Sequence, residues 1–110
     1  MARRYVPDAG DMVWLDFDPQ AGHEQGGRRL ALVLSPAAYN GLTGLLICCP
    51  LTSRSKGYPF EVPVSGNVPS VVLADQVRSQ DWRSRAARFH SRAPAAVIGE
   101  VRGKILALLG

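Results

Sequence analysis

The stretch GHEQGGRRLALVLSP, residues 22–36, joins a polar loop directly to an apolar strand. The loop carries a carboxylate, an imidazole and two guanidinium groups, and the run Leu30–Leu34 that follows has the length of a buried strand. A rigid strand holds the base of a charged loop in place, which is how reactive side chains are commonly positioned. A second polar cluster, Thr52–Tyr58, follows the apolar run Leu45–Cys49 in the same way. Two strand ends that present cations and hydroxyls predict an active site for an anionic substrate.

Outward from these two runs, the chain consists of short segments separated by Gly and Pro, which number 11 and 8. Alternation and apolar content predict further strands at Asp11–Phe17, Phe60–Val64, Val71–Leu73, Gln76–Arg78 and Ala86–His90. The one helix of any length is expected after Pro94, where Val97, Val101, Ile105 and Leu108 recur at helical spacing. The sequence therefore predicts a mainly β fold, a small and partly open β-barrel with a C-terminal α-helix, formed as a single domain over residues 1–110.

Composition and charge limit the class of protein and the kind of binding partner that can be expected. With 110 residues and 46% hydrophobic residues, the chain is expected to fold as one globular domain. No apolar run approaches the roughly 20 residues of a membrane span, and the start lacks a signal-peptide core, so we expect a cytoplasmic location. The net charge of +4 fits either a polyanion-binding protein or an ordinary basic surface. Because most of the cations are arginine, whose planar fork matches phosphate, nucleic acid is favoured.

The two cysteines, Cys48 and Cys49, are neighbours on a predicted strand. Their side chains therefore point to opposite faces, which disfavours a mutual disulfide, and they lack the spacing of a zinc site. We expect them to be reduced and packed. No phosphate-binding or dinucleotide-binding fingerprint and no carboxylate cluster appears, so no metal or other cofactor is predicted.

Four blocks of residues, in order along nearly the whole chain, resemble the MazF/PemK family of toxin endoribonucleases. They are Arg4–Asp8 with Gly10–Asp11 and Trp14–Pro19; Glu24–Gly27 with Arg29, Val33–Pro36 and Tyr39–Asn40; Pro50–Thr52 with Ser55–Val62; and Leu73–Ser79 with Trp82–Arg83. The resemblance implies an SH3-like barrel, a homodimer, and metal-independent cleavage of single-stranded RNA at short sequences. It further implies 2′,3′-cyclic phosphate and 5′-hydroxyl ends, and a cognate antitoxin whose acidic, disordered tail blocks the RNA site.

The resemblance also assigns catalysis to Arg29 and Thr52, with Glu24 in support. Leu30 departs from the family, which usually has proline directly after the catalytic arginine. From chemistry, the Arg29 guanidinium can hold the non-bridging oxygens of a phosphorane, although an ion pair with Asp16 or Asp18 is the ordinary alternative. The Thr52 hydroxyl can bind the phosphate or close a turn.

Glu24 is a candidate general base or base-positioner, against a solvated loop carboxylate, and the neighbouring His23 is more often incidental. The remaining candidates are substrate-binding residues. Lys56, Arg54 and Arg28 can contact flanking phosphates; Tyr58 and Phe17 can stack bases; Gln76 can read a base edge, or be a solvated strand glutamine. For Trp14, core packing is the stronger interpretation.

Two other function classes compete with the nuclease. One is an interaction protein of similar fold that poisons DNA gyrase, as the CcdB toxins do, and the other is a non-catalytic RNA-binding barrel. The presence of Arg29 with Thr52 favours the nuclease over a gyrase poison, because the gyrase poisons do not need this pair. An RNA-binding barrel would be favoured if Arg29→Ala preserved every activity that the protein shows.

Overall fold

The computed structural model describes residues 4–17, 27–66 and 69–110. Within them the chain forms seven strands and two helices. These are β1 (Asp11–Phe17), β2 (Gly27–Val33), α1 (Ala37–Thr43), β3 (Leu45–Thr52), β4 (Glu61–Val64), β5 (Ser70–Leu73), β6 (Arg78–Asp81), β7 (Arg88–Arg92) and α2 (Ala95–Leu109).

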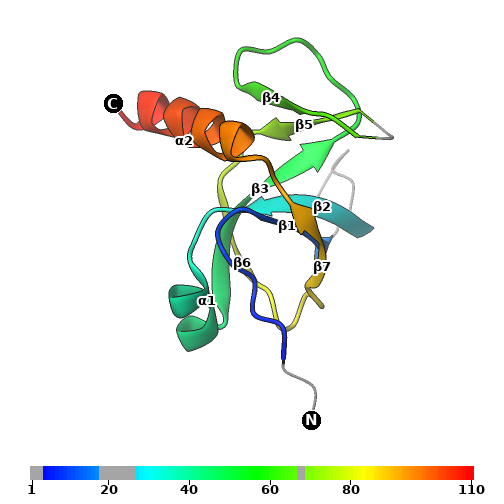
Figure 1. Ribbon diagram of the computed structural model, residues 1–110, viewed down its shortest axis with the longest axis vertical. Coiled ribbons are helices and arrows are strands. Elements are labelled where there is room, and N and C mark those ends of the chain that lie inside the picture. Colours follow the sequence, from blue (N-terminus) through cyan, green and yellow to red (C-terminus); the bar gives the residue numbers. More distant parts are fainter. Residues whose placement is uncertain (1–3, 18–26, 67–68) are drawn as a thin grey trace.

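The strands form one strongly curved antiparallel sheet in the order β4-β5-β3-β2-β1-β7. Along one edge, β3 pairs with β6 over Leu45–Cys48 and then with β5 at Leu51 and Thr52. Pro50, which has no N–H to donate, lies between the two pairings, where β3 changes partner. The change of partner lets the sheet curl into a partly open barrel, with α2 across one end and α1 at the other (Figure 1). The predicted fold class, a mainly β barrel with a C-terminal helix, is confirmed.

The sheet is buried on both faces near its middle, because alternate residues enter two different hydrophobic clusters. On β1, Met12 enters the cluster that also holds Val101 of α2, whereas Val13 and Leu15 enter a second cluster around Trp82. The burial predicted for both faces of 30–34 and 45–49 holds for most of these residues. It is wrong for Leu45 and Ile47, which are 37% and 36% exposed, because the rest of the described chain covers that face of β3 only in part.

Helix α1 was not expected from the sequence, because AAYNGLT has no apolar stripe and includes Asn and Gly, which are weak helix formers. It is held instead by the fully buried Asn40. The Asn40 side-chain amide donates to the carbonyls of Pro7 (2.7 Å) and Ser35 (2.9 Å), and its Oδ1 accepts from the Ser35 hydroxyl (2.6 Å). Gly44, with φ of 74°, ends the helix in the left-handed conformation that glycine adopts at least cost.

Several strand boundaries differ from the prediction. The largest difference is in β2, which begins at Gly27 because pairing with β1 extends that far, so Arg28 and Arg29 lie in the strand and not in the preceding loop. Strand β3 likewise continues to Thr52, which pairs with Val71 of β5.

Gln76 and Val77 precede β6 rather than belonging to a strand, because the Gln76 N–H donates to the carbonyl of Leu73 in a turn (3.0 Å). The last strand begins at Arg88 rather than at 86, because Ala86 has a positive φ of 51°. The helix predicted after Pro94 is confirmed as α2. None of the helices among the described residues is long and apolar enough to cross a membrane.

The two cysteines are free and buried, as predicted. Burial raises the pKa of both thiols to about 12. We therefore expect the native protein to resist alkylation by iodoacetamide at pH 8, because the reactive species is the thiolate. Both thiols should react once the chain is unfolded in guanidinium chloride, as intact mass would show. A native protein that takes up label within minutes would contradict this packing.

The sign of the related pH effect follows from the same shift. Below the pKa that the thiol has in the unfolded chain, the thiol is protonated in both states and does not change the free energy of unfolding. Between that pKa and the higher pKa of the folded protein, only the unfolded chain loses the proton, so the folded state loses stability as the pH rises. The free energy of unfolding should therefore fall from about pH 9 upward.

Candidate active site

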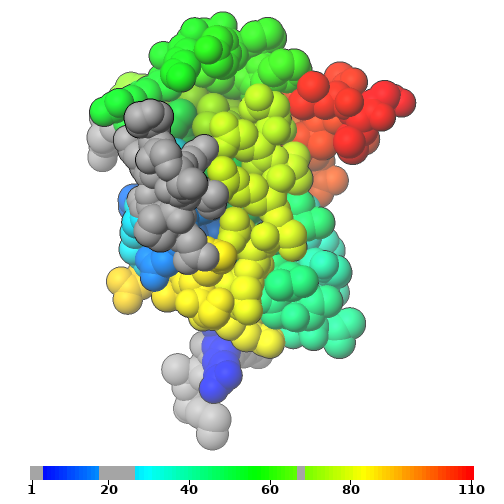
Figure 2. All heavy atoms as spheres, turned by 180° about the vertical axis from the view of Figure 1, so that it is seen from behind, coloured from blue at the N-terminus to red at the C-terminus, as the bar shows by residue number. Residues whose placement is uncertain are grey.

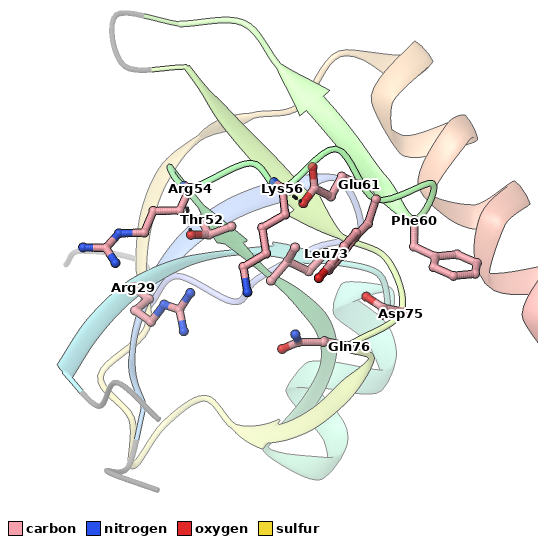
Figure 3. Close-up of a pocket in the computed structure, with 10 residues that line it drawn as sticks. Arg29, Thr52, Arg54, Lys56, Phe60, Glu61, Leu73, Asp75 and Gln76 are labelled. Atoms are coloured by element: carbon pink, nitrogen blue, oxygen red, sulfur yellow. Dashed lines mark hydrogen bonds between the residues drawn. The ribbon is translucent and has the colours of Figure 1, made fainter. Parts of the chain in front are cut away.

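A hollow of about 330 Å³ opens where the ends of β2 and β3 meet the loop between β3 and β4 (Figure 3). Its lining is mostly polar and includes three cations. The residues are Arg29, Thr52, Arg54, Lys56, Tyr58, Phe60, Glu61, Leu73, Asp75 and Gln76. Six of the nine predicted site residues therefore lie together: Arg29, Thr52, Arg54, Lys56, Tyr58 and Gln76.

Arg29 lies on β2, opposite Leu15 of β1, and is half-buried. Its Nη2 donates to the carbonyl oxygen of Leu51 (3.2 Å), which brings the guanidinium beside the end of β3. The guanidinium also lies 6.0 Å from the centre of the Phe17 ring. A backbone carbonyl and the face of an aromatic ring orient the guanidinium, and neither carries a charge that would neutralise it. Pairing with β1 continues through Leu30 and Arg29 to Gly27, so Leu30 in place of the family's proline does not interrupt β2.

Thr52 is the last residue of β3, one position beyond the carbonyl that Arg29 contacts. Its hydroxyl oxygen accepts a hydrogen bond from the backbone N–H of Arg54 (3.1 Å), so the predicted turn role is present. That bond uses the oxygen as acceptor and leaves the hydroxyl proton available to a bound anion. The turn and an anion-binding role are therefore compatible at the same residue.

Arg29, Thr52 and Arg54 line a second, adjoining hollow as well, together with Trp14, Leu30, Leu51, Ser53 and Ser70. The second hollow is about 380 Å³ and less polar than the first. Arg29 and Thr52 thus stand between two adjacent recesses. An extended chain-like anion can cross this boundary with one unit on each side.

The loop after Thr52 carries the other cations. Figure 3 shows the Lys56 side chain directed into the first hollow, toward Arg29 and Gln76, whereas Arg54 points outward. The Lys56 ammonium lies 5.9 Å from the centre of the Tyr58 ring, which is 58% exposed. An exposed aromatic face beside a cation is the usual way to hold an unstacked base.

Arg28 and Phe17 do not join this hollow. Arg28 points to the opposite face of β2, where Nη1 pairs with Asp16 (2.7 Å) and Nη2 donates to the carbonyl of Ala86 (2.7 Å). The ion pair with Asp16 that was the alternative for Arg29 is thus formed by Arg28.

Phe17 is only 5% exposed, and the guanidiniums of Arg29 and Arg78 lie over its ring at 6.0 and 5.6 Å. Its faces are covered by protein, so it supports Arg29 rather than offering a surface for a base. Glu24 and His23 lie outside the described residues.

The sequence reasoning missed four residues of the lining: Phe60, Glu61, Leu73 and Asp75. Glu61 and Asp75 both lie within the blocks that resemble the family, Glu61 beside Phe60 and Asp75 beside Gln76. Their position inside those blocks was a usable signal. Glu61 accepts hydrogen bonds from Ser55 and from backbone N–H groups, which lower the pKa of its carboxyl. Over residues 4–17, 27–66 and 69–110, no group of three or more His, Cys, Asp or Glu side chains is placed to hold a metal ion.

Comparison with known proteins shows the family of the chain. The family model described as "PemK-like, MazF-like toxin of type II toxin-antitoxin system" matches residues 8–109. The chain is 50% identical over 111 residues to the endoribonuclease toxin MazF of Escherichia coli K12, covering 100% of both.

Solved structures agree as well. The structure is similar to crystalline MazF from Deinococcus radiodurans, with a TM-score of 0.90, 67% identity, and coverage of 97% of this chain and 99% of that one. It matches the MazE–MazF complex from the same organism with a TM-score of 0.89, 67% identity, and coverage of 97% and 98%. The chain therefore belongs to the PemK-like, MazF-like toxins of type II toxin–antitoxin systems, the family of endoribonuclease toxins that its sequence resembles.

Proposed function

We propose that this protein is a sequence-specific endoribonuclease toxin that cleaves single-stranded RNA. The observation that carries the proposal is the position of Arg29 and Thr52 between two hollows, with Lys56 and Gln76 across the first of them. A scissile phosphate at this boundary would place one neighbouring nucleotide in each hollow. Duplex RNA keeps its bases stacked and paired, so a site of separate recesses fits a single strand.

In the proposed reaction the 2′-hydroxyl oxygen attacks the adjacent phosphorus, and the 2′ proton passes to a base. The bond from phosphorus to the 5′ oxygen breaks, and that oxygen takes up a proton, which leaves a 2′,3′-cyclic phosphate and a 5′-hydroxyl. Arg29 binds the non-bridging oxygens as negative charge collects there, and the Thr52 hydroxyl donates to the same phosphate.

Glu24 is the proposed base or base-positioner. Asp75 is a described carboxylate of the first hollow that can act on either proton. Because the nucleophile belongs to the substrate, the proposed reaction requires no metal ion or cofactor.

The substrate contacts extend from this centre. Lys56 and Arg54 are proposed to bind flanking phosphates, and Tyr58 to stack a base. Gln76, in the turn after β5, can read a base edge. Trp14, half-buried in the wall of the second hollow, can contact the base on that side. The cytoplasm, where messenger RNA is found, is the proposed location.

A cognate antitoxin is the proposed protein partner. Arg29 and Lys56 in the first hollow, with Arg54 at its rim, suit an acidic, disordered tail, which would compete there with RNA. The relative from D. radiodurans has been crystallised with MazE, which supports a partner of this class.

The test is incubation of the purified protein with a long mixed-sequence RNA in EDTA, followed by mapping of the cut ends. We expect discrete cuts at a short recurring sequence, with cyclic-phosphate termini, and no cuts by Arg29→Ala. A folded wild type that cuts nothing would favour the gyrase-poison or RNA-binding alternatives, and a gyrase supercoiling assay would separate those two.

We also propose that the protein is a homodimer. Three leucines near the C-terminal end of α2 are exposed: Leu106 is 67%, Leu108 46% and Leu109 77% exposed. That end of the helix projects from the body of the molecule (Figure 2). Exposed apolar side chains grouped in this way are typical of an interface.

Sedimentation velocity at micromolar concentration should therefore show a dimer, and Leu106→Asp/Leu109→Asp should shift it to a monomer with an unchanged circular dichroism spectrum. Leu42→Asp, at an 86% exposed position on α1, is the matched control. A wild type that sediments only as monomer would refute the dimer.

A further inference from the structure

Glu61, the first residue of β4, has its carboxylate directed at the loop that carries Lys56. Its Oε1 accepts hydrogen bonds from the Ser55 hydroxyl (2.6 Å) and the Gly57 backbone N–H (3.2 Å). Its Oε2 accepts one from the Lys56 backbone N–H (2.9 Å). All three donors belong to consecutive residues, and hydrogen bonds to an ionised acceptor are stronger than those between neutral groups.

The backbone of the loop is shaped to surround this carboxylate. Gly57 has φ of +73°, which turns successive N–H groups toward one point and forms a concave binding site for an anion. The Ser55 hydroxyl also accepts from the Gly57 N–H (3.3 Å), and the Glu61 N–H donates to the Tyr58 carbonyl (3.1 Å). Glu61 therefore closes the loop with its side chain and with its backbone.

The consequence for the hollow concerns Lys56. Residues 53–58 belong to no helix or strand, so regular backbone pairing does not fix the direction of the Lys56 side chain. Its backbone N–H is held by Glu61, and its side chain runs from that point toward Arg29 and Gln76 (Figure 3). An anchor at the backbone limits the rotations that would carry the ammonium out of the hollow.

Direct binding of substrate by Glu61 is disfavoured by charge. A carboxylate in the wall of a phosphate-binding hollow repels the substrate unless its own charge is compensated. Here both oxygens accept from the loop, and the Ser55 hydroxyl together with the backbone donors holds the pKa of the Glu61 carboxyl below its ordinary value. The side chain is thus ionised and already occupied at neutral pH.

We propose that Glu61 is a positioning residue, which folds the Ser55–Tyr58 loop around its carboxylate and thereby holds Lys56 where a substrate phosphate binds. This inference rests on the proposed function, since it takes the phosphate to belong to RNA. It assigns Glu61 no contact with the reacting atoms.

The test is a double-mutant cycle of Glu61→Gln and Lys56→Ala, scored by kcat/KM on a short RNA that contains one cleavage site. If Glu61 acts through Lys56, each single variant should lose about tenfold, and the double variant should lose no more than Lys56→Ala alone. Additive losses, about a hundredfold in the double variant, would overturn the proposal. The matched control is Asp81→Asn, which removes a carboxylate that likewise holds a turn, through the Ser84 N–H (3.0 Å), but does not line the hollow. It should leave kcat/KM unchanged.

A second measurement does not depend on catalysis. Amide hydrogen exchange of the RNA-free protein, followed by NMR, should show faster exchange at Lys56 and Gly57 in Glu61→Gln, by tenfold or more, with the strands unchanged. Unchanged exchange at both amides would overturn the proposal even if activity falls. Should the wild type cut no RNA, the proposed function fails, and amide exchange alone decides whether Glu61 holds the loop.

Discussion

Arg29→Ala should lower kcat/KM for RNA cleavage by about a thousandfold, with the fold and the oligomeric state unchanged. The magnitude is that of removing a donor that binds developing negative charge in a transition state. Arg29 is half-buried, and its one side-chain hydrogen bond within residues 4–17, 27–66 and 69–110 is to the Leu51 carbonyl, so its loss should cost little stability. The measurement is cleavage of a fluorescent single-site RNA, with circular dichroism as the check on folding.

Two further variants test whether the loss of activity comes from the guanidinium of Arg29. Arg29→Lys keeps the charge but loses the two-pronged geometry, so it should recover only a small part of the activity. Arg28→Ala is the matched control, because it removes the same residue type at the next position. Its side chain faces Asp16 and Ala86 on the other side of β2, so activity should remain within a few-fold of wild type. An Arg29→Ala variant within tenfold of wild type would refute the catalytic assignment.

Asn40→Ala should lower the free energy of unfolding by about 3 kcal/mol, the cost of leaving several buried polar groups without partners. Asn40 is fully buried, and its side chain satisfies the carbonyls of Pro7 and Ser35 and the Ser35 hydroxyl. The Ser35 hydroxyl in turn accepts from the Ile47 N–H (2.8 Å), so the damage should reach β3. Urea unfolding, followed by tryptophan fluorescence, measures the change.

Leu42→Ala is the control on the same helix. Leu42 is 86% exposed, so its truncation should change the free energy of unfolding by less than about 0.5 kcal/mol. If Asn40→Ala behaved like Leu42→Ala, the buried network would not be what holds α1 against the barrel.

Much of the barrel could be predicted from local pattern. The alternation in Asp11–Phe17, the apolar run Leu30–Leu34 and the spacing of Val97, Val101 and Ile105 each reflect a periodicity that one element imposes on its own residues. Helix α1 has no such pattern, because its stability comes from Asn40 contacts with residues as distant as Pro7. Long-range contacts of this kind leave no local periodic signal, which is why the helix was missed.

The candidate site likewise has features that local sequence predicts and features that depend on long-range contacts. The sequence by itself determined that Arg29 and Thr52 stand at the ends of apolar strands, since strand length and loop composition are local properties. Only the tertiary structure decided that Arg29, rather than Arg28, faces the hollow, because the pairing of β2 with β1 sets which face each side chain takes. It also decided that Phe17 lies under two guanidiniums, and that Glu61 binds the loop five residues before it. These contacts of Arg29, Phe17 and Glu61 depend on how the curled sheet brings strand ends that are far apart in the sequence close together. No local stretch of sequence specifies that arrangement.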